Sequence, residues 1–154
     1  RVTVLKNVMF ARVPDMSLFK VIFGLFSKED KLVALDSLNK VGILDKAYIR
    51  ADQLSGGQQQ RVSLARALSQ ESEILLADEP VSALDPVTAK EVMDDFKRIN
   101  EEFNKTILLN IHHVELALEY ASRIIAVKKG KIVYDGPSQE VTKEILDEVY
   151  RKEA

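Results

Sequence analysis

Apolar residues follow a helical spacing at the start of the chain, and this pattern changes near Leu54. Between residues 29 and 41, apolar side chains return every three positions, at Leu32, Leu35, Leu38 and Val41. This recurrence predicts one face of a helix, and related patterns predict helices at residues 2–12 and 17–26. Residues 1–54 are therefore expected to form an all-helical part of the protein.

After Leu54, helix and strand patterns alternate, which is typical of a parallel sheet with crossover helices. The expected strands cover residues 74–78, 106–111 and 123–127, and the expected helices cover residues 57–68, 86–103 and 114–120. The turn Lys129-Gly130 should return the chain as a hairpin strand at residues 131–134. A last helix is expected at residues 138–152, with Ser138 or Thr142 as its cap. The predicted fold class is therefore α/β.

Composition narrows the class of protein. The 154 residues are 46% hydrophobic, which is enough for one domain with a core. The formal net charge of -2, with both signs interspersed, argues against nucleic acid as the main partner. The absence of Cys excludes disulfides, thiol nucleophiles and cysteine-ligated zinc, and it fits a reducing compartment such as the cytoplasm. No apolar run is long enough for a membrane-spanning helix, so membrane contact is expected only through a partner.

The residues Ser55-Gly56-Gly57-Gln58 open one of the predicted helices. Two glycines let backbone N–H groups approach an anion closely, and the positive end of the helix dipole faces it there. The same residue types are also common in an ordinary helix cap and turn. The segment therefore predicts either a phosphate site or a simple helix start.

The strand predicted at residues 74–78 ends in Asp78 and is followed directly by Glu79. Four apolar residues precede Asp78, which predicts a strand buried on both faces. Ligands of open α/β sheets bind at the carboxyl ends of strands, so these two carboxylates are placed to bind Mg2+ and to activate a water. The alternative is a pair of solvated carboxylates at a strand end.

Two runs of sequence, residues 54–61 (Leu-Ser-Gly-Gly-Gln-Gln-Gln-Arg) and residues 73–80 (Glu-Ile-Leu-Leu-Ala-Asp-Glu-Pro), resemble the signature and Walker B motifs of ATP-binding-cassette (ABC) ATPases. Either motif alone is weak, but their order and close spacing are specific. The resemblance implies part of a P-loop NTPase-like cassette. Residues 1–54 would be its helical subdomain, and residues 55–154 the C-terminal half of a mostly parallel sheet with flanking helices.

The resemblance also implies a nucleotide site shared between two subunits. Ser55 and the backbone N–H groups of Gly56 and Gly57, together with Gln58, would contact the γ-phosphate of an ATP held by the second subunit of a head-to-tail homodimer. Asp85 would belong to the D-loop, which crosses the same interface. Asp85 is equally a candidate helix cap before Pro86, and these two roles are compatible.

The remaining chemical roles fall on the acidic pair and on one histidine. By the resemblance, Asp78 would bind Mg2+ through water, and Glu79 would orient and polarise the water that attacks ATP. His112 follows the strand predicted at residues 106–111 and would touch the γ-phosphate and support Glu79. A histidine at such a position is otherwise an ordinary surface residue.

No segment matches the phosphate loop Gly-x-x-x-x-Gly-Lys-Ser/Thr of a complete cassette, and the chain has only six glycines. We interpret the chain as the C-terminal part of a cassette, and we expect that part alone neither to bind nor to hydrolyse ATP. Truncation would leave apolar faces and a strand edge open to water, so the chain is expected to be an oligomer, a swapped arrangement or a cleaved remnant of a longer protein.

Residues that flank the motifs, at 28–31, 41–48, 50–53, 110–112 and 132–137, are most similar to the ATPase subunits of phosphonate importers. This likeness implies a subunit on the cytoplasmic face of the cell membrane, with transmembrane permease subunits as partners and a solute-binding protein as an indirect one. An importer for another small solute, a soluble ABC ATPase outside transport and a non-enzymatic interaction module are also compatible with the sequence. The apolar residues at 17–26 are expected to lie mostly in the core, or in part to line a groove for a helix of a membrane subunit.

Overall fold

The computed structural model describes residues 2–151, which form two compact units. The first unit ends at Asn110 and the second begins at Ile111. Within the described residues, no helix is both long enough and apolar enough to cross a membrane. Residues on both sides of Leu54 belong to the first unit, so the assignment of residues 1–54 and 55–154 to separate parts of a cassette stays a prediction.

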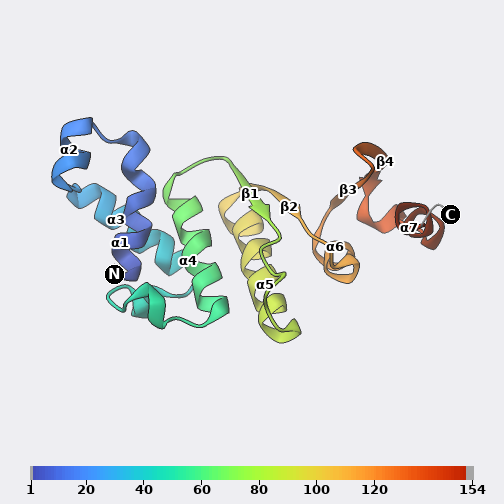
Figure 1. Ribbon diagram of the computed structural model, residues 1–154, viewed down its shortest axis with the longest axis horizontal. Helices are drawn as coiled ribbons and strands as arrows, with labels where there is room; N and C mark the ends of the chain where they lie inside the picture. Colours follow the sequence, from blue (N-terminus) through green and yellow to red (C-terminus); the bar gives the residue numbers. More distant parts are fainter. Residues whose placement is uncertain (1, 152–154) are drawn as a thin grey trace. The chain divides into compact units, whose positions relative to one another are not determined.

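The first part of the first unit is helical, as expected. Its helices are α1 (Val4–Met9), α2 (Leu18–Phe23), α3 (Lys28–Lys40) and α4 (Gly56–Ser69), with 3₁₀ turns at Phe10–Asp15, Leu44–Lys46 and Ala51–Gln53. Helices α1, α3 and α4 pack against one another (Figure 1). Their shared core contains the fully buried side chains of Val4, Val8, Leu38 and Ala65.

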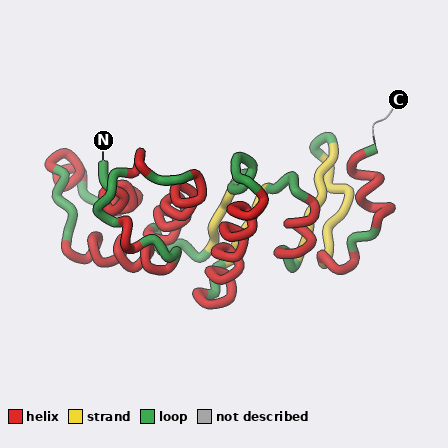
Figure 2. The backbone as a smooth tube through the Cα atoms, turned by 90° about the horizontal axis from the view of Figure 1, so that it is seen from below, coloured by secondary structure: helices red, strands yellow, loops and turns green. Residues whose placement is uncertain are grey.

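A two-stranded parallel sheet follows the helices. Strand β1 (Ile74–Asp78) pairs in register with β2 (Thr106–Asn110), and α5 (Pro86–Phe103) forms the crossover between them (Figure 2). The buried side chains of α5 include Val92, Met93, Phe96 and Ile99.

The expectation that β1 is buried on both faces was wrong for this chain. Leu75 is only 3% exposed, whereas Ile74 and Leu76 are 58% and 74% exposed. Successive side chains of a strand point to opposite faces, so one face of β1 is covered and the other is bare. Leu108 of β2 is also exposed. Within the described residues, no third strand pairs with this sheet.

The apolar residues at 17–26 also differ from expectation. Phe19, Ile22, Phe23 and Leu25 are exposed rather than buried in the core. The rings of Phe19 and Phe23 contact each other at a centroid distance of 4.7 Å. These side chains belong to α2 and the turn after it, while the side chains of Leu18 and Val21, which the expectation also covered, lie outside the described part of the structure.

The second unit combines a hairpin with two helices. It contains α6 (Val114–Tyr120), β3 (Arg123–Lys128), β4 (Lys131–Pro137), a 3₁₀ turn at Ser138–Glu140 and α7 (Lys143–Tyr150). Lys129 and Gly130 have φ values of 50° and 75°, the two positive angles of a tight hairpin turn, as predicted. The Lys128 side chain donates hydrogen bonds to the carbonyl oxygens of Glu148 and Arg151, which places the end of α7 beside β3.

Two predicted helices have different limits in the structure. The helix expected at residues 2–12 changes to a 3₁₀ turn from Phe10 onward, and this turn contains Pro14, which lacks an N–H for helical bonding. The helix expected at residues 138–152 begins only after Thr142, whose side chain accepts the hydrogen bond of the Ile145 N–H. Its predicted last residue lies outside the described residues.

Candidate functional site

Helix α4 begins with a capping box made by Ser55 and Gln58. The Ser55 hydroxyl oxygen accepts a hydrogen bond from the Gln58 N–H at 3.4 Å, and the Ser55 N–H donates to the Gln58 side-chain oxygen at 3.1 Å. This arrangement satisfies two backbone N–H groups of the first turn. The N–H groups of Gly56 and Gly57 also belong to the first turn of α4, which has no internal acceptors for them. The structural and the anion-binding interpretations of this segment are therefore compatible.

Gly56 and Gly57 lie where a larger residue would collide with its neighbours. A Cβ atom on Gly57 would stand 2.5 Å from the Thr88 methyl carbon Cγ2, and one on Gly56 would stand 3.1 Å from Leu84 Cδ2. Both glycines thus allow the start of α4 to approach the start of α5 and the loop before it. The structure brings the predicted signature segment beside the predicted D-loop of the same chain.

Asp85 is the N-cap of α5. Its carboxylate accepts hydrogen bonds from the Val87 N–H at 3.1 Å and the Thr88 N–H at 3.0 Å, and Pro86 occupies the first helical position. Hydrogen bonds from the Thr88 side chain and backbone, and from the Val87 backbone, hold the pKa of Asp85 below its usual value. The capping role expected from the sequence is present.

The acidic pair lies at the carboxyl end of β1, where the strand order predicts a site. Asp78 is exposed and stands opposite Asn110 of β2 in the register. The Asn110 side-chain amide donates a hydrogen bond to Asp78 Oδ1 at 2.7 Å, and the Asn110 carbonyl oxygen accepts the Glu79 N–H at 2.9 Å. Asn110 thus contacts both acids.

Glu79 has a backbone conformation that non-glycine residues rarely adopt, with φ of 46°. The Glu79 N–H donates to Asn110, as described above. The Glu79 carbonyl oxygen accepts hydrogen bonds from the Ser82 N–H at 3.3 Å and the Ser82 hydroxyl at 3.1 Å. Both peptide groups of Glu79 are therefore held. Such conformations cluster at active sites, where the surrounding structure imposes them.

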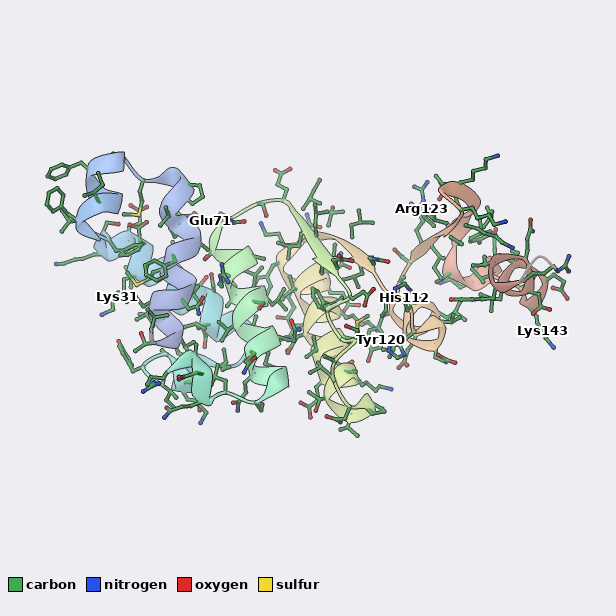
Figure 3. All side chains as sticks on the ribbon, in the orientation of Figure 1. Lys31, Glu71, His112, Tyr120, Arg123 and Lys143 are labelled. Atoms are coloured by element: carbon green, nitrogen blue, oxygen red, sulfur yellow. The ribbon has the colours of Figure 1, made fainter. Side chains whose placement is uncertain are left out.

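His112 belongs to the second unit, whereas Asp78, Glu79, Ser55, Gly56, Gly57, Gln58 and Asp85 all belong to the first. His112 is exposed and lies just before α6 (Figure 3). Its expected contact with Glu79 and with a γ-phosphate stays a prediction.

Sequence reasoning assigned no role to Asn110, nor to the ion pairs that Asp95 of α5 makes with Arg61 and Arg98. For Asn110, the available signal was a polar residue closing the strand beside β1. Arg61 ends the predicted signature run and binds Asp95 of α5 through Nε at 2.6 Å, and Arg98 binds the same carboxylate at 2.8 Å. Asp95 is 8% exposed and Arg61 is partly exposed, so a mostly buried carboxylate of α5 binds α4 through Arg61.

Comparison with known proteins then decides the family. Residues 1–82 match the sequence profile described as ABC transporter. The chain belongs to the ABC transporter family. It is 97% identical over 153 residues to the phosphonates import ATP-binding protein PhnC of Lactococcus lactis subsp. cremoris (strain SK11), covering 99% of the chain and 62% of that protein. The family and the likeness to phosphonate importers that the sequence predicted are confirmed.

Solved structures confirm the α/β cassette fold. A metal-chelate type ABC transporter in an inward-facing conformation superposes with a TM-score of 0.89 at 25% identity, over 97% of the chain and 58% of that structure's chain. A dimeric ATP-binding cassette in a post-hydrolysis state with ADP and Pi superposes with a TM-score of 0.69 at 34% identity, over 89% of the chain and 57% of that structure's chain. The chain thus spans about three fifths of the length of such relatives.

Within this ABC chain, the residues at the end of β1 fit a Mg2+ ion of the kind that accompanies a nucleotide. Mg2+ keeps several waters and is usually bound by one or two carboxylates together with substrate phosphates. Asp78 offers one exposed carboxylate there, fixed at one oxygen by Asn110. Among the described residues, no group of three or more His, Asp or Glu side chains could hold a metal ion by itself, so phosphate oxygens would have to supply further ligands.

Proposed function

We propose that the chain is part of an ATP-hydrolysing subunit that powers a membrane importer for phosphonate or a related small solute. The observation that carries this proposal is the acidic pair Asp78-Glu79 at the carboxyl end of β1, in a chain 97% identical to a phosphonates import ATP-binding protein. The nucleotide would be Mg-ATP, and a phosphate loop outside these 154 residues would complete its binding site.

Each site residue has a task that its position supports. Mg-ATP, when bound, supplies the phosphoryl group that is transferred to water. Asp78 would hold Mg2+ through water, and Glu79 would orient and polarise the attacking water. Hydrogen bonds fix both peptide groups of Glu79, which supports its task, because phosphoryl transfer depends mainly on positioning and charge stabilisation. His112 would contact the γ-phosphate and support Glu79.

The capped start of α4 would complete the site of a second subunit. Ser55, Gln58 and the N–H groups of Gly56 and Gly57 would face the γ-phosphate of the ATP bound there, in a head-to-tail homodimer. Asp85 would contribute from the adjacent loop at the same interface. One of the similar structures is a dimeric cassette, which supports pairing of two such subunits.

The remaining partners follow from transport. The subunit would lie on the cytoplasmic face of the cell membrane, bound to transmembrane permease subunits, and a solute-binding protein would deliver the cargo to those subunits. The exposed apolar side chains of Phe19, Ile22 and Phe23 form a surface suited to a permease contact.

The test is Glu79→Gln in the full-length gene product. The variant should bind Mg-ATP with unchanged affinity by calorimetry, while the ATPase rate falls about 100-fold or more, because the amide cannot polarise the attacking water. Glu73→Gln is the matched control, since Glu73 is exposed at the opposite end of β1 and should leave the rate unchanged.

Three results would contradict the proposal: a full-length protein that binds no Mg-ATP, a Glu79→Gln variant with the wild-type rate, or an equal loss in the Glu73→Gln control. The 154-residue chain by itself serves as a second comparison. It is expected to release no phosphate from ATP, because the charge-stabilising contacts of a phosphate loop are missing from its sequence.

A further inference from the structure

Asn110 touches both residues of the acidic pair through different atoms. Its side-chain amide nitrogen donates to Asp78 Oδ1 at 2.7 Å, and its backbone carbonyl oxygen accepts the Glu79 N–H at 2.9 Å. These contacts follow from the parallel register, which places Asn110 directly opposite Asp78 at the ends of β1 and β2. The nearest other β2 residue on the same face, Leu108, lies two positions along the strand and stands opposite Leu76 instead.

The amide contact fixes the direction of the Asp78 carboxylate. An ionised carboxylate only accepts hydrogen bonds, so the donor must be the Asn110 NH2 group. Hydrogen bonds to an ionised acceptor are shorter and stronger than those between neutral groups, and 2.7 Å is at the short end of their range. The terminal torsion of Asp is otherwise broad, so the hydrogen bond to Oδ1 favours one orientation of the carboxylate.

The backbone contact acts separately, on Glu79. A substitution at Asn110 removes the amide but keeps the carbonyl oxygen that accepts the Glu79 N–H. The two hydrogen bonds from Ser82 to the Glu79 carbonyl oxygen are also kept. A side-chain variant of Asn110 therefore changes the setting of Asp78 and leaves the backbone of Glu79 as it was.

We propose that Asn110 is a positioning residue that sets the affinity for Mg2+ by orienting the Asp78 carboxylate. This inference rests on the proposed function, which gives Asp78 its role toward Mg2+. Residues that hydrogen-bond to metal-ligating groups commonly change metal affinity or activity by about 10-fold to 100-fold when they are replaced. Asp78 would hold Mg2+ through water, so the Asn110 amide lies one step further from the metal, and we expect an effect at the lower end of this range.

The first experiment measures Mg2+ dependence without turnover. In the full-length Glu79→Gln protein, ATP binding is titrated by calorimetry at increasing Mg2+, with and without Asn110→Leu. Leu has nearly the shape of Asn but donates no hydrogen bond, so the half-saturating Mg2+ concentration should rise about 10-fold. Asn110→Ala, which adds no apolar branch, should act in the same direction. Asn39→Leu, at an exposed position of α3, is the matched control and should leave the Mg2+ requirement unchanged.

A second measurement tests the contact itself and needs no nucleotide. In the 15N-labelled 154-residue chain, the side-chain NH2 signal of Asn110 should be shifted by its bond to Asp78, and Asp78→Ala should return it to the position of a solvent-exposed Asn. Asp147→Ala, in α7 of the second unit, should leave the signal in place.

The outcomes separate this inference from the proposed function. A full-length protein that fails to bind Mg-ATP at all overturns the proposed function and, with it, the Mg2+ role of Asn110. If the protein binds Mg-ATP, but Asn110→Leu and Asn110→Ala keep both the folded stability and the Mg2+ requirement of the parent, the positioning role is overturned while the proposed function stands. The positioning role is also overturned if the Asn110 NH2 signal does not shift in Asp78→Ala.

Discussion

Asp85 carries a negative charge at the start of α5, where the backbone N–H groups of Val87 and Thr88 point toward it. These hydrogen bonds and that of the Thr88 side chain favour the ionised carboxylate and lower its pKa in the folded protein. The unfolded chain lacks this preference. Asp85 therefore contributes stability that is present above its unfolded pKa, near 3.8, and is lost as the pH falls through the lower folded value.

Replacing Asp85 with Asn should make the stability of the folded protein depend less on pH in the acid range. The Asn side chain still caps α5 through its carbonyl oxygen but does not titrate. We expect the melting temperature of Asp85→Asn to lie slightly below that of the wild type at neutral pH and to fall less as the pH drops from neutral to below the unfolded pKa, near 3.8. Thermal melts of both proteins across this interval check the prediction. Parallel curves would contradict it.

At the scale of elements, the start of α4 packs so closely against the start of α5 that a larger residue on one would collide with the other. Gly57 is buried, and the Thr88 methyl group occupies the space that a Cβ atom would need. In an isolated helix, Ala is more favourable than Gly by about 1 kcal/mol. The collision should reverse this preference in the protein.

Gly57→Ala should therefore lower the free energy of unfolding by about 1–3 kcal/mol, the usual cost of overpacking. Thr88→Ser removes the methyl group but keeps the hydroxyl that supports Asp85, so the double variant Gly57→Ala/Thr88→Ser should regain most of the loss. Gly56→Ala is the milder control, because its Cβ would meet only the flexible end of Leu84 at 3.1 Å. Urea denaturation of the four proteins of the cycle gives the coupling energy. A value near zero would show that the two residues do not compete for space.

Element types and limits were predictable where the sequence carries its own chemical signals. Asp85 and Pro86 mark the start of α5, and the structure begins that helix at Pro86, as expected. Positions decided by tertiary neighbours were not predictable. The periodic residues after Phe10 read as helix, but the chain turns into a 3₁₀ segment there. The contact of Asn110 with Asp78 depends on a strand register that local patterns do not specify.

At the scale of the molecule, the sheet leaves apolar side chains in water. Ile74, Leu76 and Leu108 share one face of β1 and β2 and are exposed, whereas Leu75 on the other face is buried. Local sequence could not decide this, because four apolar residues in a row look the same whether one layer or two cover the strand. A bare apolar face of this kind favours association.

The 154-residue chain should therefore self-associate, and Leu76→Lys should weaken that association. The substitution places a charge on an exposed site, so the free energy of unfolding should change by no more than about 0.5 kcal/mol. Leu75→Ala is the matched comparison and should lower it by about 2–5 kcal/mol, because this side chain is buried. Sedimentation velocity across protein concentrations measures the association. A monodisperse wild-type monomer would contradict the prediction.

The division of the chain at Asn110 also distributes its chromophores unevenly. There is no Trp, and three of the four Tyr residues, at 120, 134 and 150, lie in the second unit. Tyr48 of the first unit and Tyr150 are 69% and 61% exposed, so their surroundings change little on unfolding, whereas Tyr120 and Tyr134 of the second unit are only partly exposed. Tyrosine emission thus reports mainly on the second unit, while the helical circular dichroism comes mostly from α1 to α5 of the first. The two signals therefore report on different units without any added label, and comparing their transitions in Gly57→Ala shows whether the two units unfold together.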